Sequence, residues 1–350
     1  MILDQLNVPI VLAPLAGGPT TPQLAAAVSE AGGLGFLAAG YLTVDALRDR
    51  ITAARALTRA PLGVNVFVPG DSPAAPETVA AYVAGLRDDA QAAGAALGEP
   101  RFEDDDWAAK IDLLTADPLP VTSFTFGCPD QAVITALQEA GSEVWVTVSN
   151  PADAEEAAGA GADVLVVQGA EAGGHRGAFR DHPAADPCGF GLLPLLQLVG
   201  ARTGLPLVAA GGISTGAGIA AVLAAGATAA QLGTAFLRSP EAGTSQVHRD
   251  AIAGSGETAM TRAFTGRLAR GIRNAFLDAH SADAPVAYPE LHHVTAPLRA
   301  AGRAAGDPNL VNLWAGQAHE LTAELPAADL VAQLAYEAQE ALRSAADRWG

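Results

Sequence analysis

The 350-residue sequence predicts an α/β protein of the (β/α)8 TIM barrel type, followed by a smaller and mostly helical C-terminal part. Short apolar runs alternate with longer helical segments as far as about residue 240, and eight of these runs are typical of strands in a buried parallel sheet. Beyond that point the strand pattern disappears. A doubly wound open sheet usually has fewer strands, so we favour the barrel.

The first three strands are expected at residues 8–13, 35–39 and 62–68, where the runs are apolar apart from Asn65 in the third. Helices are expected between them at residues 23–31, which end at a Gly-Gly pair, and at residues 44–57. The third strand contains Asn65. An amide in a buried strand is costly unless it is bonded, so Asn65 is either a satisfied core residue or a ligand contact.

Residues 71–116 interrupt the alternation with two helical stretches around an acidic turn at 103–106, which we expect to be a solvated face. The pattern then resumes, with strands expected at residues 121–126, 143–148, 164–167, 206–210 and 229–232. The accompanying helices are expected at residues 130–140, 152–158, 194–203 and 215–225.

We therefore divide the chain into a barrel over residues 1–240, with a helical insertion at about 71–116, and a helical cap over residues 241–350. The cap contains helical segments at 247–253 and 327–348, and we expect the second of these to return to the barrel wall.

The composition argues against several classes of function. The formal net charge is −18 and Lys110 is the only lysine, which argues against a nucleic-acid partner. Cys128 and Cys188 form no CxxC pair, which argues against a zinc site or a disulfide framework and favours a reducing cytoplasm. The N-terminus lacks the features of a signal peptide, and no apolar window is long enough for a bilayer. We expect a soluble cytoplasmic protein without a metal site.

The segment 163–177, DVLVVQGAEAGGHRG, carries the main functional hypothesis. A buried strand ends at Gln168 and a glycine-rich loop presents His175, at the end of a parallel strand where barrels hold their chemistry. A single histidine is more often structural. Here the glycines, the strand end and the Gln168 amide converge, so His175 is our candidate catalytic residue. Glu171 and Arg176 are expected to form an ion pair at the rim.

A second pair of motifs predicts a phosphate site. VAAGGI at 208–213 and QLGT at 231–234 end the seventh and eighth strands, whose loops often bind phosphate in barrels. Gly212, Gly233 and Thr234 are the expected contacts, unless the glycines only form tight turns. With Gln168 and Asn65 directed at a planar heterocycle, the pattern favours flavin mononucleotide (FMN) over a sugar phosphate. The lysine or carboxylate pair of barrel aldolases and isomerases is missing.

Three other motifs are weaker. Residues 212–216, GISTG, fit the nucleophile elbow of serine hydrolases but lie in a repeating βα series without an oxyanion loop. Residues 216–221 fit a loose dinucleotide motif but lie within an expected helix. His292 and His293 are expected to be a surface pair in a loop bounded by prolines.

Taken together, QGAEAGGHRG, VAAGGI, QLGTAFL, PLAGG, GVNV, FTGRLARGIRNAF and NLWAGQ resemble the nitronate monooxygenases, also called 2-nitropropane dioxygenases. The resemblance runs through nearly the whole chain. It implies FMN bound by Asn65, Gln168, Gly173, Gly212, Gln231, Leu232, Gly233 and Thr234. His175 matches the histidine of the branch with an AGGHRG loop, whereas Leu15 replaces a methionine that is common near the flavin.

The resemblance implies oxidation of an alkyl nitronate such as propionate 3-nitronate by O2, with a small molecule as the only partner and without NAD(P)H. It does not distinguish a monomer from a homodimer. Tyr288 and Arg299 are candidates to close the pocket and hold a substrate carboxylate. The alternatives are an FMN-dependent NAD(P)H reductase of enoyl thioesters or quinones, which shares the motifs of strands 6 to 8, and a non-catalytic flavin- or phosphate-binding barrel.

Overall fold

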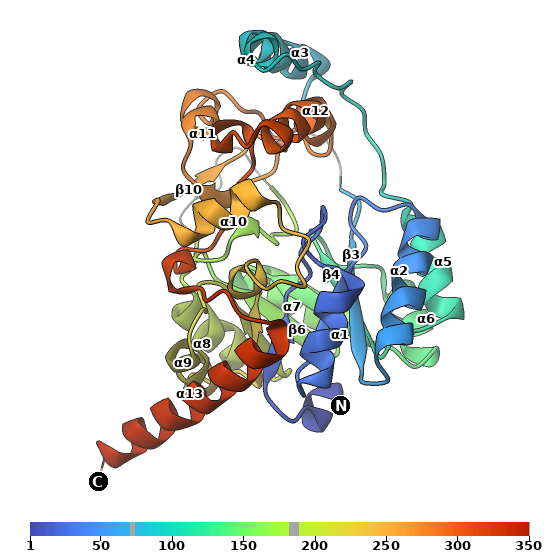
Figure 1. Cartoon of the computed structure of the whole chain (residues 1–350). Coiled ribbons are helices and arrows are strands. Elements are labelled where there is room, and N and C mark those ends of the chain that lie inside the picture. The colour runs from blue at the N-terminus through green and yellow to red at the C-terminus, as the bar shows by residue number, and fades with distance from the viewer. Residues whose placement is uncertain (71–73, 182–188, 350) are drawn as a thin grey trace.

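The computed structural model describes residues 1–70, 74–181 and 189–349 (Figure 1). Eight parallel strands form one sheet in the order β1-β9-β8-β6-β5-β4-β3-β2, and a bridge between Val11 and Leu34 joins its two edges into a barrel. The strands are β1 Ile10–Leu12, β2 Gly35–Ala38, β3 Leu62–Phe67, β4 Val121–Thr125, β5 Glu143–Val148, β6 Val164–Gln168, β8 Leu207–Ala210 and β9 Ala229–Leu232. The predicted (β/α)8 barrel is confirmed.

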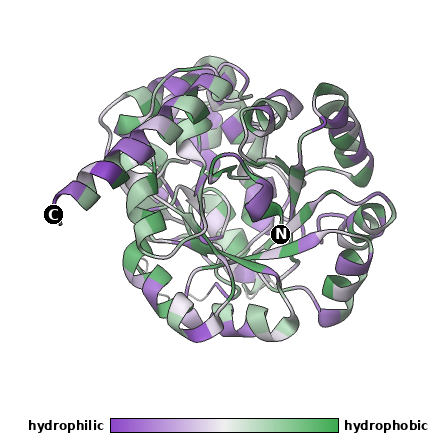
Figure 2. Ribbon diagram, turned by 90° about the horizontal axis from the view of Figure 1, so that it is seen from below, coloured by the Kyte–Doolittle hydropathy of each residue, from purple (hydrophilic) through white to green (hydrophobic). Residues whose placement is uncertain are grey.

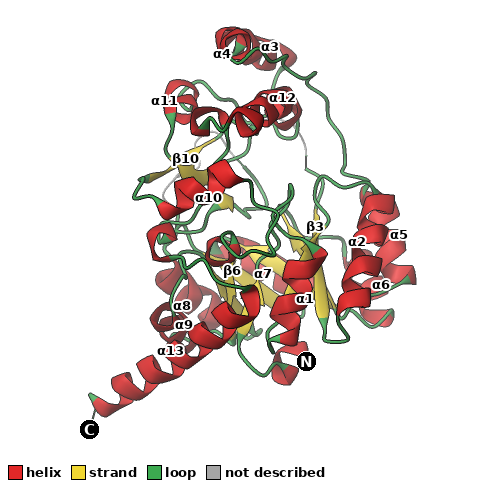
Figure 3. Cartoon of the chain, viewed as in Figure 1, coloured by secondary structure: helices red, strands yellow, loops and turns green. Residues whose placement is uncertain are grey.

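Helices surround the barrel on the outside (Figures 2 and 3). They are α1 Pro22–Glu30, α2 Val44–Leu57, α5 Trp107–Ala116, α6 Gln131–Glu139, α7 Pro151–Ala160, α8 Leu192–Thr203 and α9 Gly216–Ala224. Several begin at a residue whose side chain accepts a hydrogen bond from the first turn, as Thr21, Thr43, Asn150 and Thr215 do. The GISTG motif is therefore the N-terminal cap of α9.

The barrel interior is filled by apolar side chains, including Phe36, Trp145 and Val208. The 3₁₀ helix η1, Ile2–Gln5, adds Ile2 and Leu3 to this cluster. A separate and larger cluster packs the outer face of the sheet against the helices. Because the interior is a packed core, ligands can bind only at the ends of the strands.

A third hydrophobic cluster joins two parts of the chain that are far apart in sequence. Tyr82 and Leu86 from the first part pack with Phe264, Phe276 and Leu291 from the second. We call the elements around this cluster the cap: α3 Pro76–Gly85, α4 Arg87–Ala92, β10 Thr258–Thr261, β11 Ala269–Ile272, α11 Ala275–His280 and α12 Glu290–Ala305. In Figure 1 they lie together above the barrel.

The residues of the expected insertion therefore divide between two places. The helices α3 and α4 belong to the cap, whereas α5 packs beside α2 and α6 in the ring around the barrel. The expectation that the acidic turn at 103–106 is a solvated face is wrong for Asp105. The Asp105 side chain is 17% exposed and forms an ion pair with Lys110 at 2.8 Å.

The expectation that strands end at residue 240 is wrong. Strands β10 and β11 form a three-stranded antiparallel sheet with β7, Gly174–His175. Their sequences, TAMT and ARGI, contain no continuous apolar run. These short strands depend on pairing with neighbours, which a single-sequence pattern does not reveal.

The last helix, α13 Ala327–Asp347, packs on α9 and α1 through Leu330, Val331 and Leu334. Its Glu337 carboxylate accepts a hydrogen bond from the Gly216 N–H at 3.1 Å. The final turns extend away from the body (Figure 1). The remaining elements are α10 Gln246–Ala253 and the 3₁₀ helices η2 Thr234–Phe236, η3 Pro308–Leu310 and η4 His319–Leu321. Within the described ranges, none of the helices has the length and apolar character needed to cross a membrane.

The close contact between Gly35 of β2 and α1 predicts that a side chain at this position destabilises the fold, and Gly159 of α7 serves as the comparison. A Cβ on Gly35 would lie 1.9 Å from the Ala25 carbonyl oxygen, whereas a Cβ on Gly159 in α7 would meet no atom within 4 Å. We expect Gly35→Ala to destabilise the fold by about 3 kcal/mol or more, and Gly159→Ala to stabilise it by roughly 0.5–1 kcal/mol. Chemical denaturation measures both, and equal effects would contradict the packing described here.

Candidate active site

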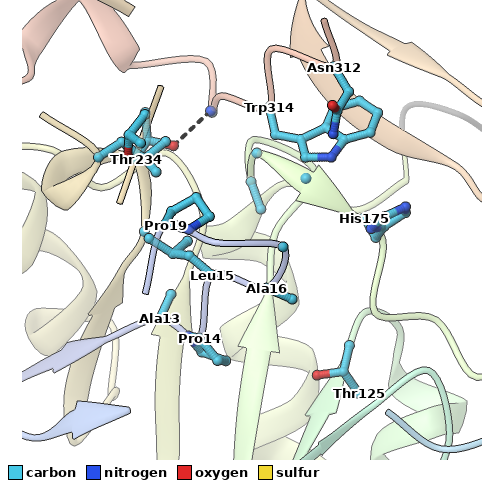
Figure 4. A pocket seen from close by; sticks show the side chains of 18 of the residues that line it. Ala13, Pro14, Leu15, Ala16, Pro19, Thr125, His175, Thr234, Asn312 and Trp314 are labelled. Atoms are coloured by element: carbon cyan, nitrogen blue, oxygen red, sulfur yellow. Dashed lines mark hydrogen bonds between the residues drawn. The ribbon is translucent and has the colours of Figure 1, made fainter. Parts of the chain in front are cut away.

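A cavity of about 500 Å³ opens at the carboxyl ends of the strands, beneath the cap (Figure 4). The cavity brings together His175 and nearly all the residues expected to bind a cofactor, namely Asn65, Gln168, Gly173, Gly212, Gln231, Gly233 and Thr234. The exception is Leu232. The residue is 1% exposed, its side chain packs in the core between sheet and helices, and its carbonyl oxygen accepts a hydrogen bond from the Ala13 N–H at 2.8 Å.

His175 lies between the barrel and the cap. It belongs to β7, which pairs with β11 through Ala269, and its Nε2 lies 2.8 Å from the Thr265 hydroxyl. The rings of Tyr288 and Trp314 pack against the imidazole. Burial, with smaller contributions from Arg267 and Arg299, lowers the pKa of His175 to about 3, so the ring is neutral at physiological pH.

The Thr265 hydroxyl influences which nitrogen of His175 is protonated. Its oxygen lies 3.3 Å from the Arg267 carbonyl oxygen, to which it can donate. In that arrangement His175 Nε2 donates to Thr265, and Nδ1 is left as an acceptor. When the hydroxyl donates to Nε2 instead, Nδ1 carries the proton. The site therefore has both a donor and an acceptor form of the same neutral ring.

Two buried guanidinium groups lie near this histidine. Arg267 lies over the Phe126 ring, 4.0 Å from its centroid, and donates to the Ala178 carbonyl oxygen. Arg299 lines the cavity and is 6% exposed. Its Nε donates to Thr295 Oγ1 at 3.0 Å and its Nη2 to the His292 carbonyl oxygen at 2.8 Å.

Burial lowers the pKa of Arg299 to about 10, which leaves it a cation at neutral pH. Within residues 1–70, 74–181 and 189–349, neither Arg267 nor Arg299 forms an ion pair with a carboxylate. An unpaired buried cation is costly, so the cavity is electrostatically suited to an anion.

The expectation that His292 and His293 form a surface pair in a loop is wrong. Both lie in α12, because Pro289 is the N-cap of that helix and Pro297 lies inside it. The His292 ring is stacked on Tyr41 with a centroid distance of 4.0 Å, and burial lowers its pKa to about 2. His293 pairs with Glu103 at 3.1 Å.

The loop before His175 is held by its own polar side chains. Gln168 Nε2 donates to the His175 carbonyl oxygen at 3.0 Å, and Gln168 Oε1 accepts from the Gly177 N–H at 2.8 Å. The expected ion pair between Glu171 and Arg176 is replaced by separate bonds to the main chain. Glu171 accepts from the Leu192 N–H at the start of α8, and Arg176 donates to the Gly169 carbonyl oxygen.

Asn65 is directed by its neighbours on β4. Its Nδ2 donates to Ser123 Oγ at 2.9 Å and to Thr125 Oγ1 at 3.0 Å. The amide is therefore fixed, and its oxygen has no donor among the hydrogen bonds of the described residues. Asn65 is 2% exposed and lines the cavity.

The motifs after β8 and β9 form the other side of the cavity. Gly211 and Gly212 have φ values of +119° and +67°, a conformation that side chains disfavour. Thr234 begins η2, and its hydroxyl accepts from the Gly316 N–H at 3.0 Å. The first N–H groups of a helix have no partner inside it and can bind an anion. Figure 4 shows Thr234 and His175 on opposite sides of the cavity.

Comparison with known proteins identifies the family. The family model described as nitronate monooxygenase matches residues 2–337. A probable nitronate monooxygenase of Staphylococcus saprophyticus is 38% identical over 344 residues, covering 96% of each chain. The chain belongs to the nitronate monooxygenase family, and is therefore an oxidoreductase.

Solved structures of other proteins are similar to this family member. A nitroalkane oxidase from Streptomyces ansochromogenes has a TM-score of 0.95 and 49% identity, with 98% of this chain and 99% of that chain covered. FabK from Thermotoga maritima has a TM-score of 0.76 and 26% identity, with 99% and 97% covered.

Several residues of this nitronate monooxygenase site were not singled out from the sequence. Tyr41 follows β2, so the strand-end rule could have identified it. Thr265, Arg267 and Trp314 lie within segments that resemble the family, but nothing in their spacing places them beside His175. The position of His292 depends on how α12 packs, which the sequence does not specify.

The buried histidines give a pH-dependent prediction for this family member. Burial lowers the pKa of His248 to about 4, and its Nε2 lies 2.9 Å from the Trp314 carbonyl oxygen. Because the folded pKa lies below the unfolded value of about 6.5, the stabilisation is complete above that pH and is lost as pH falls towards 4. This loss amounts to roughly 3 kcal/mol.

The His248→Gln variant keeps an N–H donor but cannot be protonated. Between pH 6.5 and pH 4 we therefore expect its free energy of unfolding to fall by roughly 3 kcal/mol less than that of the wild type. Denaturant unfolding at several pH values measures the difference. Identical pH dependence in both proteins would show that His248 is not buried in its neutral form.

Proposed function

We propose that this chain is an FMN-dependent nitronate monooxygenase that converts alkyl nitronates, such as propionate 3-nitronate, and O2 to a carbonyl compound and nitrite. The observation that carries the proposal is one cavity that holds a neutral His175, the unpaired cation Arg299 and, on the opposite side, the glycine turn at Gly212 with the start of η2 at Thr234. An anionic substrate would pair with Arg299, and the phosphate of a cofactor would bind the main-chain N–H groups of the turn.

The residues of the cavity fit FMN. The main chain of Gly212 and Thr234 suits the phosphate, because the backbone turns sharply there and leaves N–H groups free at a helix start. The fixed amides of Asn65 and Gln168 suit the edge of a planar heterocycle. Gly173, Gln231 and Gly233 complete the lining, and Leu232, between two lining residues in sequence, packs in the core behind it.

FMN, when bound, supplies the electron transfer that the side chains of this protein cannot perform. The protein's contribution is to bind, orient and desolvate the substrate. The apolar and aromatic rings around His175 exclude water, which strengthens each charge interaction with an anion.

His175 has one of two roles, depending on the substrate. With Nδ1 protonated it donates a hydrogen bond to a nitronate oxygen, and with Nδ1 free it accepts the carbon-bound proton of a neutral nitroalkane. Its low pKa makes it a weak base in the ligand-free protein. This favours the preformed anion as the better substrate.

Arg299 holds a second anionic group of the substrate in this proposal. Its Nε and Nη2 are fixed by Thr295 and His292, which preserves the direction of the guanidinium before a ligand arrives. A nitronate with a carboxylate tail then places its two charges at His175 and Arg299.

The proposal is tested by spectroscopy and an oxygen electrode. Purified protein should be yellow, and propionate 3-nitronate should bleach it anaerobically and drive oxygen consumption without a pyridine nucleotide. Oxidation of NADH coupled to an enoyl thioester or a quinone would establish the reductase instead. A yellow protein without turnover would indicate a non-catalytic flavin-binding barrel, and a colourless esterase would indicate a hydrolase.

Replacement of His175 tests its role. We expect His175→Ala to lower kcat/KM by about 100-fold or more while the flavin absorbance is retained, because no other group replaces the imidazole. Steady-state kinetics and the ratio of flavin to protein measure this. Loss of flavin with the specific rate unchanged would assign His175 a structural role.

Replacement of Arg299 tests the anion site. We expect Arg299→Met to raise KM for propionate 3-nitronate by about tenfold or more, with a much smaller effect on an alkyl nitronate that lacks a carboxylate. Arg273→Met is the control, because Arg273 is exposed and pairs with Asp278. The same change in KM for both substrates would contradict a carboxylate anchor.

A further inference from the structure

The only lysine of the chain is completely buried. Lys110, on α5, is 0% exposed, and its Nζ lies 2.8 Å from Asp105 Oδ2 and 3.1 Å from the carbonyl oxygen of Ala39, just after β2. Burial raises the pKa of Asp105 to about 6, and Lys110 opposes that shift. Replacing such pairs with apolar residues is often neutral or stabilising, so stability alone does not explain this one.

The second oxygen of the carboxylate holds the loop after β2. Asp105 Oδ1 accepts the Tyr41 N–H at 2.9 Å. Tyr41 and Asp105 have φ values of 66° and 58°, in the left-handed region that residues with side chains rarely adopt. Asp106 makes a parallel contact by accepting the Val44 N–H at 3.1 Å. The ion pair therefore fixes two strained loops to each other.

The Tyr41 side chain connects the barrel to the cap. Its hydroxyl lies 3.2 Å from that of Tyr288, and its ring is stacked on His292 of α12. The Tyr288 ring in turn lies edge-on to His175, with centroids 5.8 Å apart. Burial raises the pKa of Tyr41 to about 12, so both contacts are made by a neutral phenol.

We propose that Asp105, whose buried charge Lys110 neutralises, is a positioning residue that fixes Tyr41 and, through Tyr288 and His292, the position of the cap over the cavity. The pair touches neither substrate nor cofactor. It acts on how tightly the cavity holds a substrate, and it takes no part in the contacts of His175 with β11, Thr265 and Gln168. This inference goes beyond the proposed function and uses that reaction only as one readout.

The test compares two double variants that both remove the buried ion pair. Asp105→Asn with Lys110→Met keeps an acceptor oxygen for the Tyr41 N–H, and Asp105→Gly with Lys110→Met removes it. Both replacements at position 105 tolerate the positive φ. Neither leaves an unpaired buried charge, so a difference between them reports the bond to Tyr41.

We expect the glycine variant to raise KM for the nitronate by about tenfold, with kcat within about twofold of the wild type. The asparagine variant should retain a KM within about threefold of the wild type. Hydrogen–deuterium exchange without substrate should be faster in residues 40–44 and 286–296 of the glycine variant only. Asp117→Asn is the control, because it removes the exposed ion pair between Arg55 of α2 and the C-cap of α5, and it should change neither KM nor exchange.

Equal KM values and equal exchange in the two double variants would overturn the proposal, as would a loss of kcat with KM unchanged. Hydrogen–deuterium exchange tests the role of the pair even if the wild type fails to oxidise nitronates. Failure of the proposed function can therefore be distinguished from failure of this inference. If a double variant does not fold, Tyr41→Phe decides instead. It keeps the stacked ring, and a KM that does not rise when the bond to Tyr288 is lost would overturn the proposal.

Discussion

The pairing of β7 with β11 is the constraint on which the site depends. The chain leaves the barrel at β6, forms the two-residue strand β7 and thereby joins the antiparallel sheet of the cap. The Gln168 amide closes this connection by bonding the main chain on both sides of Arg176. His175 is consequently held by contacts with both parts of the molecule.

The electrostatics of the cavity are opposite to those of the whole chain. The protein carries a formal charge of −18, yet its cavity combines the buried guanidinium group of Arg299 with a neutral imidazole. Concentrating positive charge in a low-dielectric pocket favours an anion there far more than on the surface. The net negative charge of the whole chain opposes binding of larger polyanions.

The sequence predicted the barrel well because its strands are short segments rich in apolar residues, a signal that depends only on neighbouring residues. The strand ends then located His175, Gln168 and the glycines after β8 and β9 at one mouth. Contacts between distant segments were not predictable in this way. The stacking of His292 on Tyr41 and the burial of Asp105 arise from packing across the chain, and β10 and β11 depend on partners rather than on their own composition. The side chain of Leu232 faces the core because alternate residues of a strand point to opposite faces.

The filled interior of the barrel has a consequence for access to the site. Since Phe36, Trp145 and η1 occupy the far end, no route leads through the centre of the sheet. Reactants and products must share the entrances between the cap and the strand ends. The seating of the cap on the strand ends therefore bears on both the entry and the departure of small molecules.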